Sequence, residues 1–205
     1  KSQFLTDFPL FTDPKYEFFG IKTLNHTYDL IMQDAHYTWD QRFLELFNRC
    51  LERYENGDED FTNYYTEDDQ AFLDSIGYKP REFFDFVEDF GDGGDPTVES
   101  AILIAAVRRD YFLTIQKGEP SNKEMQNDEL PGRNSEMGGH VWLPRIIQKA
   151  KNKLRGENCP DIMYSCGGDR GFLKEHDIHP ADFLRVVWAA DGDDQKVLDY
   201  VNQRR

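Results

Sequence analysis

The 205-residue sequence has few long apolar runs and few cysteines. Its longest apolar run, 101–107, is far shorter than the roughly 20 residues that a membrane-spanning helix needs. It offers no signal-peptide core either. The three cysteines, Cys50, Cys159 and Cys166, are an odd number, and their spacing fits no Cys-x-x-Cys pair. These absences lead us to expect a cytoplasmic protein from a reducing compartment, without a disulfide framework.

Basic residues are scarce as well. The chain has 24 Lys and Arg against 39 Asp and Glu, which gives a net charge of −15, and most of the acid excess lies in residues 1–117. Nucleic acids and anionic membranes bind basic surfaces, so we expect neither as a partner. Solvation is the simplest explanation for the acidity. A basic protein partner for the acidic N-terminal half is the alternative.

Common nucleotide and hydrolase motifs are also missing. The sequence contains no Gly-x-x-x-x-Gly-Lys loop, no Gly-x-Gly-x-x-Gly turn after a strand and no Gly-x-Ser-x-Gly elbow. His176 and His179 are separated by a predicted helix end and followed by Pro180, so they do not form a metal pair on one helix face. We expect no cofactor and no metal site.

An internal repeat organises what is present. Residues that recur one hundred positions later are Tyr64, Asp69, Phe72, Leu73, Pro80 and Phe83. Upstream, Trp39 and Arg42 match Trp142 and Arg145 at a spacing of 103, which would place an insertion in the loop 55–62. In this register Lys149 aligns with Leu46. The pattern predicts two tandem copies of one unit.

The periodicity of apolar residues predicts an all-α fold, with the two helical units packed together. The expected parts are an extended, aromatic-rich arm at 1–25, a first repeat at 26–114, a linker at 115–139 and a second repeat at 140–205. Within the repeats we expect helices over about 142–155, 68–76 and 168–176, others that begin at Pro80 and Pro180, and last helices that start near Asp95 and Asp193. The stripe of the first helix should be Phe43, Leu44, Phe47 and Leu51. No segment predicts a strand.

Several motifs in the C-terminal half resemble domain-of-unknown-function family 5069. They are Pro131-Gly132-Arg133, the run from Gly138 to Arg145, Lys149-Ala150-Lys151, Leu154, Gly156, Tyr164-Ser165-Cys166, Asp169 and Phe172-Leu173. The resemblance covers 131–205 and, through the repeat, loosely 36–112. It implies a bacterial cytoplasmic protein of no established activity. Its pattern falls here on Arg133, Trp142, Arg145, Lys149, Tyr164, Cys166 and Asp169, with departures at His140 and Gln148.

The favoured functional hypothesis is a site for a small anionic metabolite. Arg145 and Lys149 lie four residues apart on one predicted helix, next to Trp142. Arginine and lysine together can hold a carboxylate or phosphate. Trp142 and Tyr164 would then form the walls of the site, and Arg133 would close over the ligand. The structural alternative is that Arg145 pairs with Asp169 and that Trp142 belongs to the core.

An enzyme is the remaining alternative, and whether the chain catalyses a reaction stays open. Cys166 lies between Tyr164 and Asp169 in the sequence, close to predicted cations. A nearby cation favours the ionised, nucleophilic form of a thiol. A nucleophilic cysteine also needs a base within hydrogen-bond reach, and His140 is the candidate that the motif brings near.

Overall fold

The computed structural model describes residues 36–58 and 60–204. The chain divides into one unit of residues 1–42 and a second of residues 43–205, and the ion pairs, hydrogen bonds and cavity described below belong to the second. The predicted arm at 1–25 and the start of the first repeat at 26 fall outside the described residues. Among the described residues, no helix is long and apolar enough to cross a membrane.

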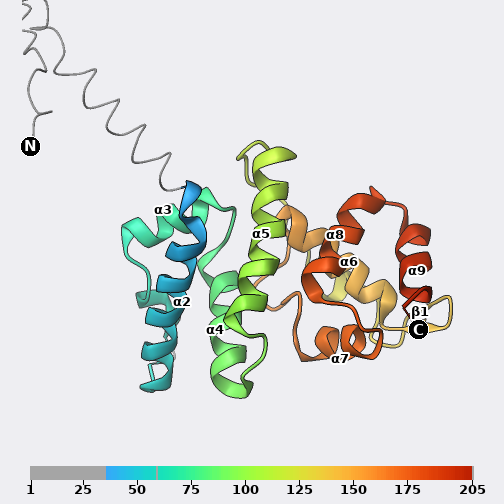
Figure 1. Cartoon of the computed structure of the whole chain (residues 1–205), viewed down its shortest axis with the longest axis horizontal. Coiled ribbons are helices and arrows are strands. Elements are labelled where there is room, and N and C mark those ends of the chain that lie inside the picture. Colours follow the sequence, from blue (N-terminus) through green and yellow to red (C-terminus); the bar gives the residue numbers. More distant parts are fainter. Residues whose placement is uncertain (1–35, 59, 205) are drawn as a thin grey trace, which may run out of the picture. The chain divides into compact units, whose positions relative to one another are not determined.

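The described chain is mostly helical, as its apolar periodicity predicts (Figure 1). Asp177 and Gly77 take left-handed backbone conformations just beyond helices α7 and α3, in agreement with the predicted helix ends. Pro80 and Pro180 begin helices, as expected. The helices are α2 (Trp39–Glu55), α3 (Glu67–Ser75), α4 (Pro80–Gly93), α5 (Val98–Thr114), α6 (Leu143–Arg155), α7 (Gly167–Glu175), α8 (Pro180–Ala190) and α9 (Asp194–Asn202), with short 3₁₀ turns η2 (Phe61–Asn63) and η3 (Asn127–Glu129).

The buried faces of α2 and α6 correct the predicted register. The buried residues of α2 are Phe43, Leu46, Phe47 and Cys50, and those one hundred positions later on α6 are Leu143, Ile146, Ile147 and Ala150, all buried. Leu44, predicted to be in the core, is 38% exposed. These buried positions are one hundred residues apart, whereas the sequence pattern indicated a spacing of 103. Periodicity alone could not distinguish neighbouring rows of large apolar residues on α2.

Helix α5 lies among helices from both ends of the second unit. It packs against α6 and α8 and also contacts α4, and Figure 1 shows it between α4 and the C-terminal helices. Its sequence is apolar nearly all round, and Ala101, Ile104 and Ala105 are fully buried. A helix enclosed on several sides needs apolar residues on all of them.

The segment 115–139 is packed onto α6 and the loop that follows it. The backbone of Met125 pairs with Glu157 at 2.7 Å and with Cys159 at 3.3 Å, and the side chains of Leu130, Cys159 and Ile162 form a small core. The prediction of no strands is wrong here. Strands β1 (Glu136–Met137) and β2 (His140–Val141) form a hairpin whose turn is two glycines with positive φ. Strands of two residues are too short to show alternation.

Buried charges link α6 to α4. The side chain of Lys153 is 3% exposed, and its Nζ lies 2.7 Å from Glu82 Oε1 and 4.2 Å from the centre of the Tyr78 ring. Burial lowers the pKa of Lys153, while the charge of Glu82 opposes that shift. The ion pair thus holds two helices together inside the protein, where an unpaired charge would be strongly unfavourable.

Truncation of this lysine should destabilise the fold. We expect Lys153→Ala to lower the free energy of unfolding by about 3 kcal/mol or more, because Glu82 loses its buried partner. The matched control is Lys151→Ala, which removes a more exposed pair with Asp194 and should lower it by less than about 1 kcal/mol. Urea unfolding of the three proteins measures both values. Equal losses in the two variants would contradict the assigned role of Lys153.

Candidate functional site

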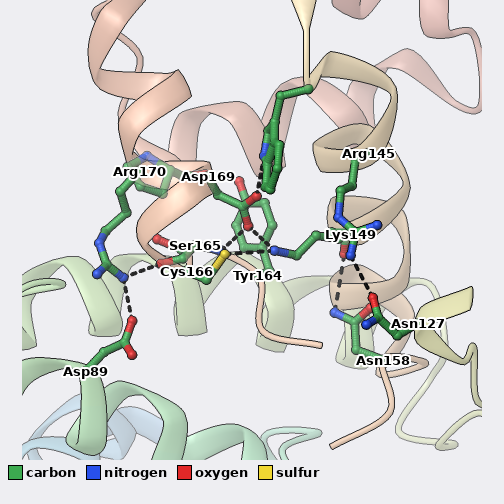
Figure 2. A network of polar contacts seen from close by, with 12 residues as sticks. Asp89, Asn127, Arg145, Lys149, Asn158, Tyr164, Ser165, Cys166, Asp169 and Arg170 are labelled. Atoms are coloured by element: carbon green, nitrogen blue, oxygen red, sulfur yellow. Dashed lines mark hydrogen bonds and ion pairs between the residues drawn. The ribbon is translucent and has the colours of Figure 1, made fainter. Parts of the chain in front are cut away.

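A fully buried carboxylate, Asp169 in the first turn of α7, is the centre of the site (Figure 2). Its Oδ1 accepts a hydrogen bond from Trp142 Nε1 at 2.9 Å. Its Oδ2 accepts from Lys149 Nζ at 2.5 Å and from the backbone N–H of Ser165 at 3.0 Å. A buried carboxylate requires such partners, so Asp169 fixes the positions of three segments that meet around it.

Two of these donors come from residues with unusual backbone conformations. Trp142, just before α6, has φ 80°, and Ser165, just before α7, has φ 69°. Residues other than glycine rarely take positive φ, and each instance costs on the order of 1–3 kcal/mol. Both residues donate directly to Asp169. The hydrogen bonds to this carboxylate therefore help to hold both strained residues in place.

Lys149 also contacts the cysteine at the start of α7. Its Nζ lies 3.1 Å from Cys166 Sγ, while the lysine side chain is only 5% exposed. Cys166 is partly exposed and occupies the position just before α7. Figure 2 shows the lysine extending from α6 toward both the sulfur and the carboxylate. The ammonium is thus held between an anion and a thiol.

The corresponding place in the N-terminal half has a different chemistry. There Asp69 pairs with Arg49 at 2.6 Å, one hundred positions before the pair of Lys149 with Asp169, while Leu46 is a buried apolar residue. Thr66 precedes α3 and caps it, since its Oγ1 accepts from the Asp69 N–H at 3.2 Å and donates to the Asp69 carboxylate at 2.7 Å. Cys166, one hundred positions later, makes no side-chain cap bond.

The first turn of α7 is therefore open. Gly167 and Gly168 are exposed, and their backbone N–H groups have no hydrogen-bond partner among the described residues. A Cβ on Gly168 would come within 2.8 Å of the Trp142 ring, so the indole lies directly on this turn. The N-terminus of a helix carries partial positive charge, and free N–H groups there can bind an oxyanion.

A cavity of about 650 Å³ borders Cys166, and its wall is acidic. Arg81 in this wall pairs with Asp85 at 2.9 Å and with Glu88 at 2.7 Å. The other lining residues are Phe61, Asp89, Pro160, Asp161 and Met163. Four carboxylates thus line the cavity with a single arginine. No local sequence pattern indicates this cavity, because its walls come from α4, η2 and the loop before α7.

Asp85 has an unusual protonation equilibrium. Burial raises the pKa of its carboxyl to about 7, and this effect outweighs the opposing charges of Arg81 and Lys153. The nearby carboxylates Glu82 and Glu88 add to the rise. At neutral pH, Asp85 is therefore present in both the protonated and the ionised form, which is the condition that a general acid or base needs.

Arg145 does not share a site with Lys149. It donates to the Pro131 carbonyl at 2.8 Å and to Asn127 Oδ1 at 2.6 Å, and its guanidinium lies 5.8 Å from the Trp142 ring centre. The predicted pair of Arg145 with Asp169 is wrong, because Lys149 takes that place. Arg145 instead fastens the segment 115–139 to α6. The two cations therefore do not converge on one anion.

The remaining predicted residues are apart from the cavity at Cys166. Arg133 is exposed. Tyr164 is buried, and its hydroxyl donates to the Pro180 carbonyl at 2.7 Å. Burial raises the pKa of the Tyr164 phenol well above its ordinary value. It serves packing between the α7 and α8 segments rather than a ligand wall.

His140 has partners other than Cys166. Its Nδ1 lies 2.9 Å from His176 Nε2, its Nε2 lies 2.9 Å from Asn202 Oδ1, and both imidazoles are buried. The prediction of His140 as the base beside Cys166 is thus not supported by the geometry. Within the described residues, no group of His, Cys, Asp and Glu could hold a metal ion.

The raised pKa of Asp85 predicts how stability changes with pH. Between about pH 4 and pH 7 the folded protein keeps a proton on Asp85 that the unfolded chain releases, so this group makes stability fall as pH rises. Asp85→Asn removes the effect. Relative to the wild type, the variant should gain stability between about pH 5 and pH 7, by at most about 1.4 kcal/mol per pH unit, and the difference should level off above that range. Urea unfolding at several pH values measures the difference in stability between the two proteins. If the free energy of unfolding changes with pH in the same way in both, the raised pKa of Asp85 is refuted.

Comparisons with known proteins identify no relative of this chain. The chain matches no family model, no curated protein and no solved structure. Its function is therefore argued from the geometry of the site.

Proposed function

We propose that the chain is an enzyme in which the Cys166 thiol attacks a small substrate that carries a cationic group. The observation that carries this proposal is the contact of 3.1 Å between Cys166 Sγ and Lys149 Nζ at the wall of an acidic cavity. The proposal keeps the enzyme alternative from the sequence but replaces His140 with Lys149 as the group beside the sulfur.

The contacts of Lys149 support a nucleophilic role for the cysteine. An ammonium next to a sulfur stabilises the negative charge of a thiolate. Asp169 holds that ammonium in place, so little reorganisation is needed when the thiolate forms. The free N–H groups of Gly167 and Gly168 belong to the same turn and supply the donors that stabilise an oxyanion when sulfur adds to a carbonyl-type carbon.

The cavity supports the assignment of the proton donor and of the substrate charge. Asp85 lines the cavity with Cys166, and a carboxyl with a pKa of about 7 can protonate a leaving group at neutral pH. Glu88, Asp89 and Asp161 give the cavity a negative potential that is only partly offset by Arg81 and by Arg170, which pairs with Asp89 at 2.7 Å. A cationic substrate fits this potential better than the anionic metabolite expected from the sequence, because Lys149 and Arg145 already have partners of their own. A basic protein partner stays a prediction.

We propose further that the two halves are tandem copies of one helical unit and that the C-terminal copy carries the site. The support is the spacing of one hundred between α3 and α7, between the starts of α4 and α8, and between the pairs Arg49–Asp69 and Lys149–Asp169. In this view Thr66 keeps a capping role while Cys166 has become reactive. The resemblance to family 5069 stays a prediction.

Thiol modification tests the proposal without knowledge of the substrate. Methanethiosulfonate reagents that carry either a trimethylammonium or a sulfonate group would be compared on the whole protein by stopped-flow kinetics and mass spectrometry. We expect Cys166 to react faster with the cation by about 10-fold or more, because the cavity is acidic. The ratio of the two reaction rates, cationic over anionic reagent, should decrease in the double variant Glu88→Gln, Asp161→Asn and at high salt.

The chain offers a matched control for this experiment. Cys166→Ser supplies the blank, since Cys50 and Cys159 are buried. Thr66→Cys in that background places a thiol at the start of α3, without Lys149 and without the cavity. If this control thiol reacts as fast as Cys166 and with the same charge preference, the proposal is wrong.

A further inference from the structure

We propose that Cys166 and Lys149 form a reversible oxidative cross-link, a sulfenamide bond between Sγ and Nζ, when the protein meets a hydroperoxide. Three features carry this modification site: the two reacting atoms are 3.1 Å apart, the sulfur is accessible from the cavity, and a proton acceptor lies against the amine. The inference does not require the catalysis proposed above, because it concerns a reaction between two groups of the protein itself.

The first step oxidises the sulfur. The Cys166 thiol and one hydroperoxide molecule give a sulfenic acid and one molecule of water or alcohol, with the peroxide reduced by two electrons. The cavity of about 650 Å³ brings the oxidant to Sγ. Cys50 and Cys159 are 0% and 4% exposed, so the same oxidant reaches Cys166 first.

The second step forms the bond. Lys149 Nζ gives a proton to Asp169 Oδ2, 2.5 Å away, and then attacks the sulfenic sulfur. The S–N bond forms, the S–O bond breaks, and one water leaves with a second proton from nitrogen. Sulfenic acids undergo this condensation with nitrogen nucleophiles. No movement of α6 or α7 is needed, because the contact between Nζ and Sγ already exists.

The cross-link would protect the thiol. A free sulfenic acid is open to further, irreversible oxidation to the sulfinic acid. Formation of the S–N bond prevents this further oxidation of the sulfur. Two equivalents of a thiol reductant then restore the free cysteine and the free amine, and the reductant is converted to its disulfide. The bond also ties α6 to α7 beside the cavity. Oxidation would thus switch off the reactivity of Cys166 reversibly.

Peroxide treatment of the whole protein tests the proposal. After addition of hydrogen peroxide, the intact mass should fall by about 2 Da, and a peptide map should show the peptides of Lys149 and Cys166 joined until dithiothreitol separates them. The map distinguishes this product from a disulfide, which has the same mass change. Disulfides, or oxygen added to Cys166 with no joined peptide, would overturn the proposal.

Two variants test the role of the lysine. Lys149→Arg keeps the positive charge but lacks a nucleophilic amine, so Cys166 should gain about two oxygen atoms and lose reversibility. Lys151→Arg alters a neighbouring lysine that pairs with Asp194, and it should still cross-link. If Lys149→Arg does not fold, the peptide map of the oxidised wild type still shows whether Lys149 and Cys166 are joined. The kinetic preference for cationic reagents is measured separately, so either proposal can fail without the other.

Discussion

The geometry of the site is set by one buried carboxylate, Asp169, which requires hydrogen-bond donors and positive charge around it. A carboxylate without solvent exposure is tolerated only when charge and hydrogen bonds surround it. Here the donors come from Lys149 on α6, the Trp142 indole and the Ser165 backbone. These three donors fix where α6, its preceding turn and the start of α7 meet. The position of the Cys166 sulfur follows from that junction, because Cys166 directly follows one donor and contacts another.

Two buried lysines on α6 are likewise each paired with an opposite charge. Lys149 and Lys153 lie one helical turn apart and are both almost fully buried, yet each has a carboxylate from another helix. Asp169 comes from α7 and Glu82 from α4. Helix α6 thus forms buried ion pairs with helices from both ends of the unit. This explains why a chain with a large acid excess keeps two lysines where solvent cannot reach them.

Helices and their limits could be predicted from the sequence, whereas the partners of charged residues could not. Pro80 and Pro180 mark helix starts through their fixed φ, and this is a local property. The choice of Lys149 over Arg145 as the partner of Asp169 depends on the position of α7, which is a tertiary property. The acidic cavity joins segments distant in sequence, and no local signal marks it.

Thr66 and Cys166 each stand directly before a helix, α3 and α7, but make different contacts there. In the N-terminal half a hydroxyl satisfies the first turn of α3, and Arg49, whose side chain is about half exposed, balances Asp69 in contact with water. In the C-terminal half the residue before α7 is Cys166, which makes no side-chain cap bond, and the cation that pairs with Asp169 is Lys149, which is withdrawn from solvent. The fold is already held by the carboxylate, its donors and the apolar faces of the helices. The cap position can therefore give up its structural hydrogen bond and hold a thiol instead. In the function and the modification proposed above, nucleophilic reactivity and its reversible protection would both arise from the same pair of atoms, Lys149 Nζ and Cys166 Sγ.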